Sequence, residues 1–173
     1  HMGTAFSSRD LKSAEFKISQ RLEVHTADSL LKVTPIIGDS AFFQGLEFLW
    51  QHKGFVTTAE WQKASIKAVN GNEFDYDGAY LQFSYFLSGQ SRKYSGSVLK
   101  TPKRASDWEF SIRYSDFTLE QENTRADILS TGVNYYFDEH WKVMASYLMT
   151  EYSQVVDGDT SGDAVSLRLQ YTF

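Results

Sequence analysis

The last twelve residues of the chain alternate apolar and polar side chains and end on an aromatic ring. In an extended strand, successive side chains point to opposite faces. The apolar and polar residues of this segment therefore fall on separate faces, Val165, Leu167, Leu169, Tyr171 and Phe173 on one and Ser166, Arg168, Gln170 and Thr172 on the other. One face suits lipid and the other suits water, although an amphipathic strand of a soluble sandwich would show the same pattern.

Eight segments in total show this period of two. They are Ala14–His25, Phe42–Gln51, Phe55–Ile66, Gly78–Leu87, Trp108–Phe117, Ile128–Phe137, Trp141–Glu151 and Asp163–Phe173. A tilted strand crosses a bilayer with about 9 to 11 residues, whereas a spanning helix needs about 20 apolar residues, and the chain has no such run. The sequence predicts an all-β fold, an antiparallel up-and-down transmembrane β-barrel of about eight strands.

The chain length of 173 residues is typical of one domain. His1-Met2-Gly3 is typical of a cloning scar, so we expect residues 1–12 to be a scar and an N-terminal lead-in. Residues 13–173 are then a single outer-membrane β-barrel domain. The natural N-terminus does not follow from the sequence.

The connections between the predicted strands differ in length. His52-Lys53-Gly54 and Asp138-Glu139-His140 leave room for a tight turn only. The connections on the opposite side are longer and polar, namely Thr26 to Ala41, Ala68 to Asp77, Leu119 to Asp127 and Tyr152 to Gly162. Short turns on one side and long loops on the other are typical of outer-membrane barrels. Ser88 to Asp107 breaks this parity, and so long a segment is usually functional or else evidence against the strand assignment.

Aromatic residues gather near the predicted strand ends, where they would form the interfacial girdles of a membrane barrel. They are Trp50, Phe55, Trp61, Trp108, Tyr135, Phe137, Trp141 and Tyr171. The alternative is that they fill the core of a soluble sheet. Tyr and Trp combine an apolar ring with one polar group, so they suit both a membrane interface and a partly solvated core.

Several function classes find no support in the composition. The chain has no cysteine, which excludes disulfides and thiolate metal sites. Its net charge of −5 gives no general attraction for nucleic acid. His25, His52 and His140 lack ligand-like spacing, and no Gly-x-Ser-x-Gly elbow is present. We therefore expect no enzyme activity, no cofactor, no metal and no nucleic-acid partner.

The stretch Gly78–Tyr94 resembles the phosphate-selective porin O/P family, and Asp107–Asp116, Gly132–Tyr136 and Gly162–Phe173 are similar to the last strands of that family. The resemblance covers about Phe42–Phe173. It implies a porin of the bacterial outer membrane, a sixteen-stranded barrel that commonly forms trimers and passes phosphate-like anions by passive diffusion. This chain has about half the required length and would supply the C-terminal eight strands.

Several arrangements remain open for a chain of this length. It could be a fragment of a porin, or two copies could pair their open edges into one larger barrel. A closed eight-stranded barrel would have a filled interior and a structural, adhesive or anchoring role. A soluble ligand-binding barrel would need its apolar residues inside and its polar residues outside. The expected partners are outer-membrane lipid or detergent and small anions, and a homo-oligomer remains open.

The polar rows of the predicted strands supply the candidate lumen residues. Those that we expect to face the lumen are Lys17, Arg21, Glu109, Arg113, Lys142 and Arg168, together with Glu15, Glu23, Glu47 and Glu60. These are five acids and five bases. Such a balance favours ion pairs that brace a filled interior, because isolated buried charges are costly.

The connection that breaks the parity is basic. Its cations are Arg92, Lys93, Lys100, Lys103 and Arg104, with no acid among them before Asp107. Positive loops can focus anions, with Arg giving forked hydrogen bonds and Lys a point charge. In the family that the chain resembles, loops fold inward and narrow the channel, so we expect an anion-binding constriction here. The alternative is a solvated basic turn without a ligand.

Overall fold

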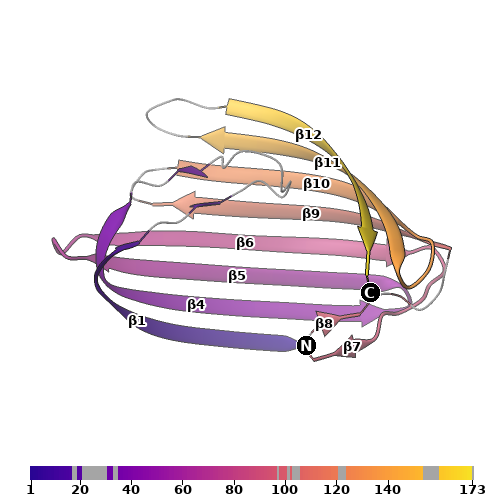
Figure 1. The fold of residues 1–173 in the computed structure, drawn as a ribbon, viewed down its shortest axis with the longest axis horizontal. Helices are drawn as coiled ribbons and strands as arrows, with labels where there is room; N and C mark the ends of the chain where they lie inside the picture. The colour runs from indigo at the N-terminus through magenta and orange to yellow at the C-terminus, as the bar shows by residue number, and fades with distance from the viewer. Residues whose placement is uncertain are drawn as a thin grey trace.

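The computed structural model describes residues 1–16, 19–20, 31–32, 35–96, 98–100, 102, 106–120, 124–153 and 160–172. Eight long strands form one antiparallel sheet (Figure 1). They are β1 (Met2–Phe16), β4 (Ile36–His52), β5 (Phe55–Ala68), β6 (Glu73–Phe86), β9 (Asp107–Leu119), β10 (Thr124–Tyr136), β11 (Trp141–Ser153) and β12 (Thr160–Tyr171). Two short ladders pair β2 (Ser19–Gln20) with β3 (Leu31–Lys32) and β7 (Tyr94–Ser95) with β8 (Val98–Leu99). The predicted all-β class is confirmed.

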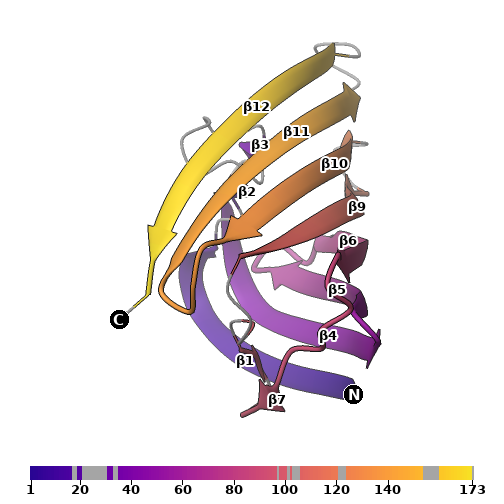
Figure 2. The same ribbon diagram turned by 90° about the vertical axis from the view of Figure 1, so that its right-hand side faces the viewer.

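The long strands follow one another in the sheet in the same order as along the chain, which is the predicted up-and-down topology. The sheet curves into an arch with β1 and β12 at its two edges (Figure 2). It is a partial barrel, and a closed eight-stranded barrel finds no support. Within the described residues there is no helix that could cross a membrane.

Seven of the eight strands lie where the alternation predicts them, but they extend further. They contain 12 to 17 residues. Two connections that we expected to be long therefore cover no more than residues 69–72 and 120–123. The additional residues carry few apolar side chains on the outward rows, so the hydrophobic pattern ends before the backbone ladder does.

The first strand corrects the prediction at the N-terminus. β1 begins at Met2 rather than Ala14, so most of the expected lead-in of residues 1–12 pairs with β4. Its apolar alternation is weak, and the long strand β4 supplies its hydrogen-bond partners. The register shifts between Asp10 and Ala14, where Lys12 and Ser13 adopt positive φ angles. This bulge places Glu15 opposite the exposed Ile37 on the convex face, and the predicted inward position of Glu15 is wrong.

The two faces of the sheet differ in polarity. On the central strand β9, Phe110 is 50% exposed on the convex face, whereas the neighbouring Glu109 is 3% exposed on the concave face. On the edge strand β12, Val165 and Leu167 are likewise exposed on the convex face. Apolar rows outside and charged residues inside are the reverse of what a soluble ligand-binding barrel requires.

We call the two ends of the sheet the turn side and the loop side. The turn side holds Lys53-Gly54, the connection between β6 and β9, and residues 137–140. Lys53 and Gly54 both have positive φ, as a two-residue hairpin turn of type I′ requires. At the loop side, residues 69–72 join β5 to β6. A buried apolar cluster lies there on the concave face, formed by Ile36, Ala41, Ile66, Ala68, Tyr76, Leu119 and Ala126.

Candidate functional site

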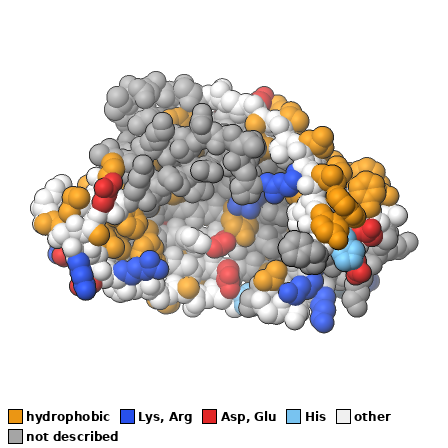
Figure 3. All heavy atoms as spheres, in the orientation of Figure 1, with side chains coloured by type: hydrophobic (Ala, Val, Ile, Leu, Met, Phe, Trp, Pro, Cys, Tyr) orange, Lys and Arg blue, Asp and Glu red, His pale blue; other side chains and the backbone are white. Residues whose placement is uncertain are grey.

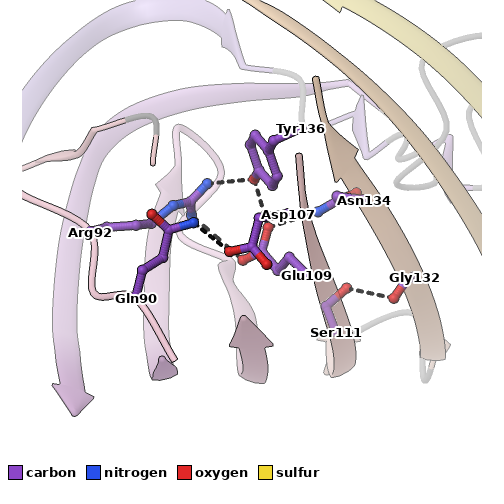
Figure 4. A network of polar contacts seen from close by, with 8 residues as sticks. All are labelled: Gln90, Arg92, Asp107, Glu109, Ser111, Gly132, Asn134 and Tyr136. Atoms are coloured by element: carbon purple, nitrogen blue, oxygen red, sulfur yellow. Dashed lines mark hydrogen bonds and ion pairs between the residues drawn. The ribbon is translucent and has the colours of Figure 1, made fainter. Parts of the chain in front are cut away.

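The start of the connection between β6 and β9 is held by Asp107, and Figure 4 shows its contact with Gln90. The Ser88 backbone N–H and Oγ donate to the carboxylate at 3.2 and 2.5 Å, and the Gln90 amide donates to the same group. Asp107 is the first residue of β9 and is 4% exposed. These bonds hold the start of the connection against the strand that follows it.

Arg92 extends from this connection over the concave face (Figure 4). Its guanidinium Nη2 donates to the Tyr136 hydroxyl at 2.8 Å, and that hydroxyl donates to Glu109 at 2.6 Å. Asn134 donates to the same Glu109 oxygen at 2.9 Å, and the second carboxylate oxygen lies 3.8 Å from Arg92 Nη1. The carboxylate of Glu109 is thus satisfied by three side chains from two different parts of the chain.

Aromatic rings complete the environment of Arg92. Its guanidinium carbon lies 5.3 Å from the Phe86 ring centroid and 5.9 Å from that of Tyr136, which is within the range of cation–π attraction. The Gln51 amide donates to the Arg92 carbonyl at 2.8 Å. Because Gln51 lies on β4 and Tyr136 on β10, the connection reaches across the concave face at the turn side.

The strand alternation explains why these side chains meet. Glu109 pairs in register with Asn134 on β10 and with Phe86 on β6, so all three point to the same face. Tyr136, two residues along from Asn134, shares that face and is 1% exposed. A buried carboxylate is tolerated there because its oxygens are paired and hydrogen-bonded.

The predicted lumen residues have different placements. Glu109, Arg113, Lys142 and Arg168 lie on concave rows of the sheet. Arg113 stacks over the Tyr80 ring at 3.8 Å, and the Lys142 ammonium lies 5.6 Å from the Tyr136 centroid. Lys17 and Arg21 lie outside the described residues.

The five cations of the basic connection are not brought together as one cluster in the described part of the chain. Arg92 is half-buried in the network with Glu109 and Tyr136, whereas Lys93 and Lys100 are exposed. The Lys100 backbone N–H donates to the Lys93 carbonyl at 2.9 Å beside the β7–β8 ladder. Lys103 and Arg104 lie outside the described residues.

Sequence reasoning missed the neutral members of the network, Ser88, Gln90, Asn134 and Tyr136. A signal for two of them was present, because the alternation of β10 places Asn134 and Tyr136 on one face. The register that aligns them with Glu109 depends on the pairing between strands, which a single sequence does not show.

The concave face contains a cavity of about 700 Å³ beyond this network, toward β1. Its lining includes Phe43, Glu47, Glu60, Tyr80 and Arg113. The view in Figure 3 shows acidic and basic side chains in the hollow of the molecule. Among the described residues, no group of His, Asp or Glu is arranged to hold a metal ion.

Apolar rows outside and charged side chains of both signs inside are typical of the wall of an outer-membrane barrel. The family of phosphate-selective porins O and P matches the chain over residues 3–173. The chain belongs to this family. It is 30% identical over 151 residues to Porin O of Pseudomonas aeruginosa (strain PAO1), an alignment that covers 75% of this chain and 34% of that protein. The chain thus spans about a third of the length of this curated relative.

Proposed function

We propose that this chain forms part of the wall of a bacterial outer-membrane channel that passes small anions such as phosphate by passive diffusion. The observation that carries the proposal is the division of the sheet into two faces. Apolar side chains such as Phe110 and Ile112 are exposed on the convex face, where lipid would cover them. No bond-making chemistry is needed for such a role, and we propose none.

The cations on the concave face support the preference for anions. Lys142 and Arg168 occupy diagonal positions on β11 and β12, because Lys142 pairs with Gln170 and Met144 pairs with Arg168. Neither forms an ion pair with an acid among the described residues, whereas Glu109 is engaged by Arg92, Tyr136 and Asn134. At this end of the concave face the three cations Arg92, Lys142 and Arg168 outnumber the two acids Asp107 and Glu109. An excess of positive charge along a lining raises the local concentration of anions.

The basic connection is the proposed constriction element. The bonds from Ser88 and Gln90 to Asp107, and from Arg92 to Tyr136, hold it across the concave face. In this arrangement Arg92 positions the connection, while Lys93, Lys100, Lys103 and Arg104 supply the charge that passing anions meet. A Lys ammonium suits this role because it is a compact charge with rotatable donors.

A conducting pore requires more strands than this arch contains. The outer edges of β1 and β12 have unpaired backbone groups, and each such group costs several kcal/mol in lipid. We propose that further strands close the barrel, supplied by the remainder of a longer chain or by a second copy. An up-and-down barrel accepts either, because β1 and β12 run in opposite directions.

Single-channel conductance in planar bilayers tests the proposal. Detergent-refolded protein is compared in phosphate and in chloride with two variants, K142Q/R168Q and K100A/K103A/R104A. The matched control is K67Q, because Lys67 is exposed on the convex face. We expect anion-selective steps whose selectivity falls in both variants and is unchanged in the control. Insertion without conductance would mean that two copies do not close a pore and that the remainder of a longer chain has to supply the missing strands. Conductance without anion selectivity, or selectivity that neither variant alters, would contradict the proposal.

A further inference from the structure

Three hairpins carry the same four-residue arrangement on the convex face. The hairpins are β5–β6, β9–β10 and β11–β12. At the turn side of each, an aromatic residue of the first strand pairs in register with a tyrosine of the second, Phe55 with Tyr85, Trp108 with Tyr135, and Trp141 with Tyr171. The ring centroids of these pairs lie 4.4, 4.7 and 4.8 Å apart.

The same hairpins carry a second pair nearer the loop side. Six residues along each first strand lies another aromatic residue, and eight residues from each tyrosine of the second strand lies an aspartate. Each ring donates a hydrogen bond to its aspartate, Trp61 to Asp77 at 2.6 Å, Tyr147 to Asp163 at 2.6 Å, and Tyr114 to Asp127. We call each set of four residues an aromatic–aspartate box.

The convex face is apolar between the two levels of the boxes and becomes polar beyond the aspartates. Between the two levels of one box, β9 presents Phe110 and Ile112, which are 50% and 47% exposed. Beyond the aspartates, the convex positions of the second strands are polar, namely Asp75, Arg125 and Ser161. The fourth hairpin, β1–β4, has Phe42 at the position of the aspartate.

The boxes also share a constant stagger. Trp61 is level with Asp116 across β6, and Tyr114 lies two residues nearer the turn side than Asp116. Tyr114 is in turn level with Met149 across β10, and Tyr147 again lies two residues nearer the turn side. The shift is one residue per strand. The rise is about 3.3 Å per residue and neighbouring strands lie about 4.8 Å apart. If the strands tilt by about 35° from the membrane normal, the boxes therefore return to one height.

All three boxes therefore lie at one height when the strands tilt as they do in membrane barrels, at about 35–45°. Eight residues from Trp108 to Asp116 then span about 22 Å along the membrane normal. That distance is close to the apolar band of about 25 Å in outer-membrane barrels.

We propose that the aromatic–aspartate boxes mark the two lipid–water boundaries of this protein and that their partner is the headgroup layers of a bilayer. The turn-side ring pairs lie at one layer. The loop-side rings lie at the other, and each directs its N–H or O–H to a carboxylate that defines the polar limit of the band. Such a donor needs a partner at the edge of lipid, where water is scarce. This inference rests on the proposed insertion into a membrane and adds depth and tilt to it.

Depth-dependent fluorescence quenching tests the placement. Three variants keep one tryptophan each, with the others replaced by phenylalanine: Trp61 alone, Trp108 alone, and I112W in a chain without the four native tryptophans. Each is refolded into phosphatidylcholine vesicles that carry bromine at defined acyl carbons. We expect bromine near the headgroup to quench Trp61 and Trp108 most, and bromine near the bilayer centre to quench I112W most. The proposal would be overturned if Trp61 were quenched at the same depth as I112W. It would also be overturned if Trp108 were quenched and Trp61 were not.

A lack of quenching in all three variants would instead contradict the proposed insertion, and the boxes with it. A second measurement varies the bilayer. The refolding yield is followed in vesicles of increasing acyl length for the D77L/D127L/D163L variant, which extends the apolar row of the second strand of each box by two residues. We expect the bilayer thickness that gives the highest refolding yield to increase by about 5 Å in this variant. The control D75L/R125L/S161L places leucine two residues further out and keeps the three box aspartates, so the bilayer thickness that gives its highest yield should not change. An unmoved optimum in the first variant, or equal shifts in both, would overturn the proposal.

Discussion

The two ends of the concave face are built on the same strands but hold together differently. At the turn side, β9 contributes Glu109 to a network of hydrogen bonds and ionic contacts with Arg92 and Tyr136. At the loop side, the same row of β9 contributes Leu119 to an apolar cluster with Ile66. The alternation of β9 therefore fixes which side chains face inward. The types of those residues decide whether an end of the sheet is stabilised by hydrogen bonds and ionic contacts or by close apolar packing.

The largest effect is expected from Glu109→Ala at the turn side. The change leaves the Tyr136 hydroxyl and the Asn134 amide without their acceptor, and the Arg92 guanidinium without its ion-pair partner. We expect a loss of about 3–5 kcal/mol in the free energy of unfolding. Urea unfolding of the detergent-refolded protein, followed by tryptophan fluorescence, measures it.

A double variant sharpens this prediction. Replacing both partners, as in R92M/E109L, removes the two charges together and should recover much of the loss. A single variant that costs under about 1 kcal/mol would show that the network does not stabilise the turn side.

The loop side should respond to volume rather than to polarity. Leu119 is 2% exposed, so Leu119→Ala leaves a cavity and is expected to cost about 3 kcal/mol. Leu119→Met keeps the volume and should cost less than about 1.5 kcal/mol. Equal losses in the two variants, by the same urea measurement, would argue that this cluster is not closely packed.

The smallest effect concerns pH and belongs to the turn side. The backbone N–H groups of Trp141 and His140 donate to Asp138 at 2.7 Å each and hold the pKa of that carboxyl below its usual range. A lowered pKa contributes stability above the pKa of the unfolded chain, about 4, that is lost as the pH falls through the folded value.

We therefore expect a loss of stability on acidification that is slightly smaller in Asp138→Asn than in the wild type, measured as the urea midpoint between pH 6 and pH 3. Leu119→Ala should leave this pH dependence unchanged. An identical pH dependence in wild type and Asp138→Asn would show that this turn does not contribute.

The sequence predicts the fold well because the convex rows alternate strongly. Trp108, Phe110 and Ile112 fix both the existence and the facing of β9, and the same holds for six of the other strands. The prediction is wrong at β1, because a bulge reverses the alternation and the edge carries few apolar residues. A period of two cannot reveal such a shift in register.

The candidate site is less predictable than the fold. The alternation places Arg113, Lys142 and Arg168 on one set of rows, but the partners of Arg92 depend on how a connection crosses the sheet. Tyr136 and Asn134 acquire their roles through long-range pairing, which has no local signature in the sequence. The charge of the connection was visible, whereas its attachment to Glu109 was not.

The most direct test of the account is the alternation of solvent access along β9. The chain has no cysteine, so single substitutions at Phe110, Ser111, Ile112 and Arg113 each introduce one thiol. In protein refolded into vesicles, we predict that a hydrophilic thiol reagent labels Ser111→Cys and Arg113→Cys and leaves Phe110→Cys and Ile112→Cys unlabelled. Uniform labelling, or the reverse alternation, would contradict the claim that the convex face meets lipid and the concave face meets water.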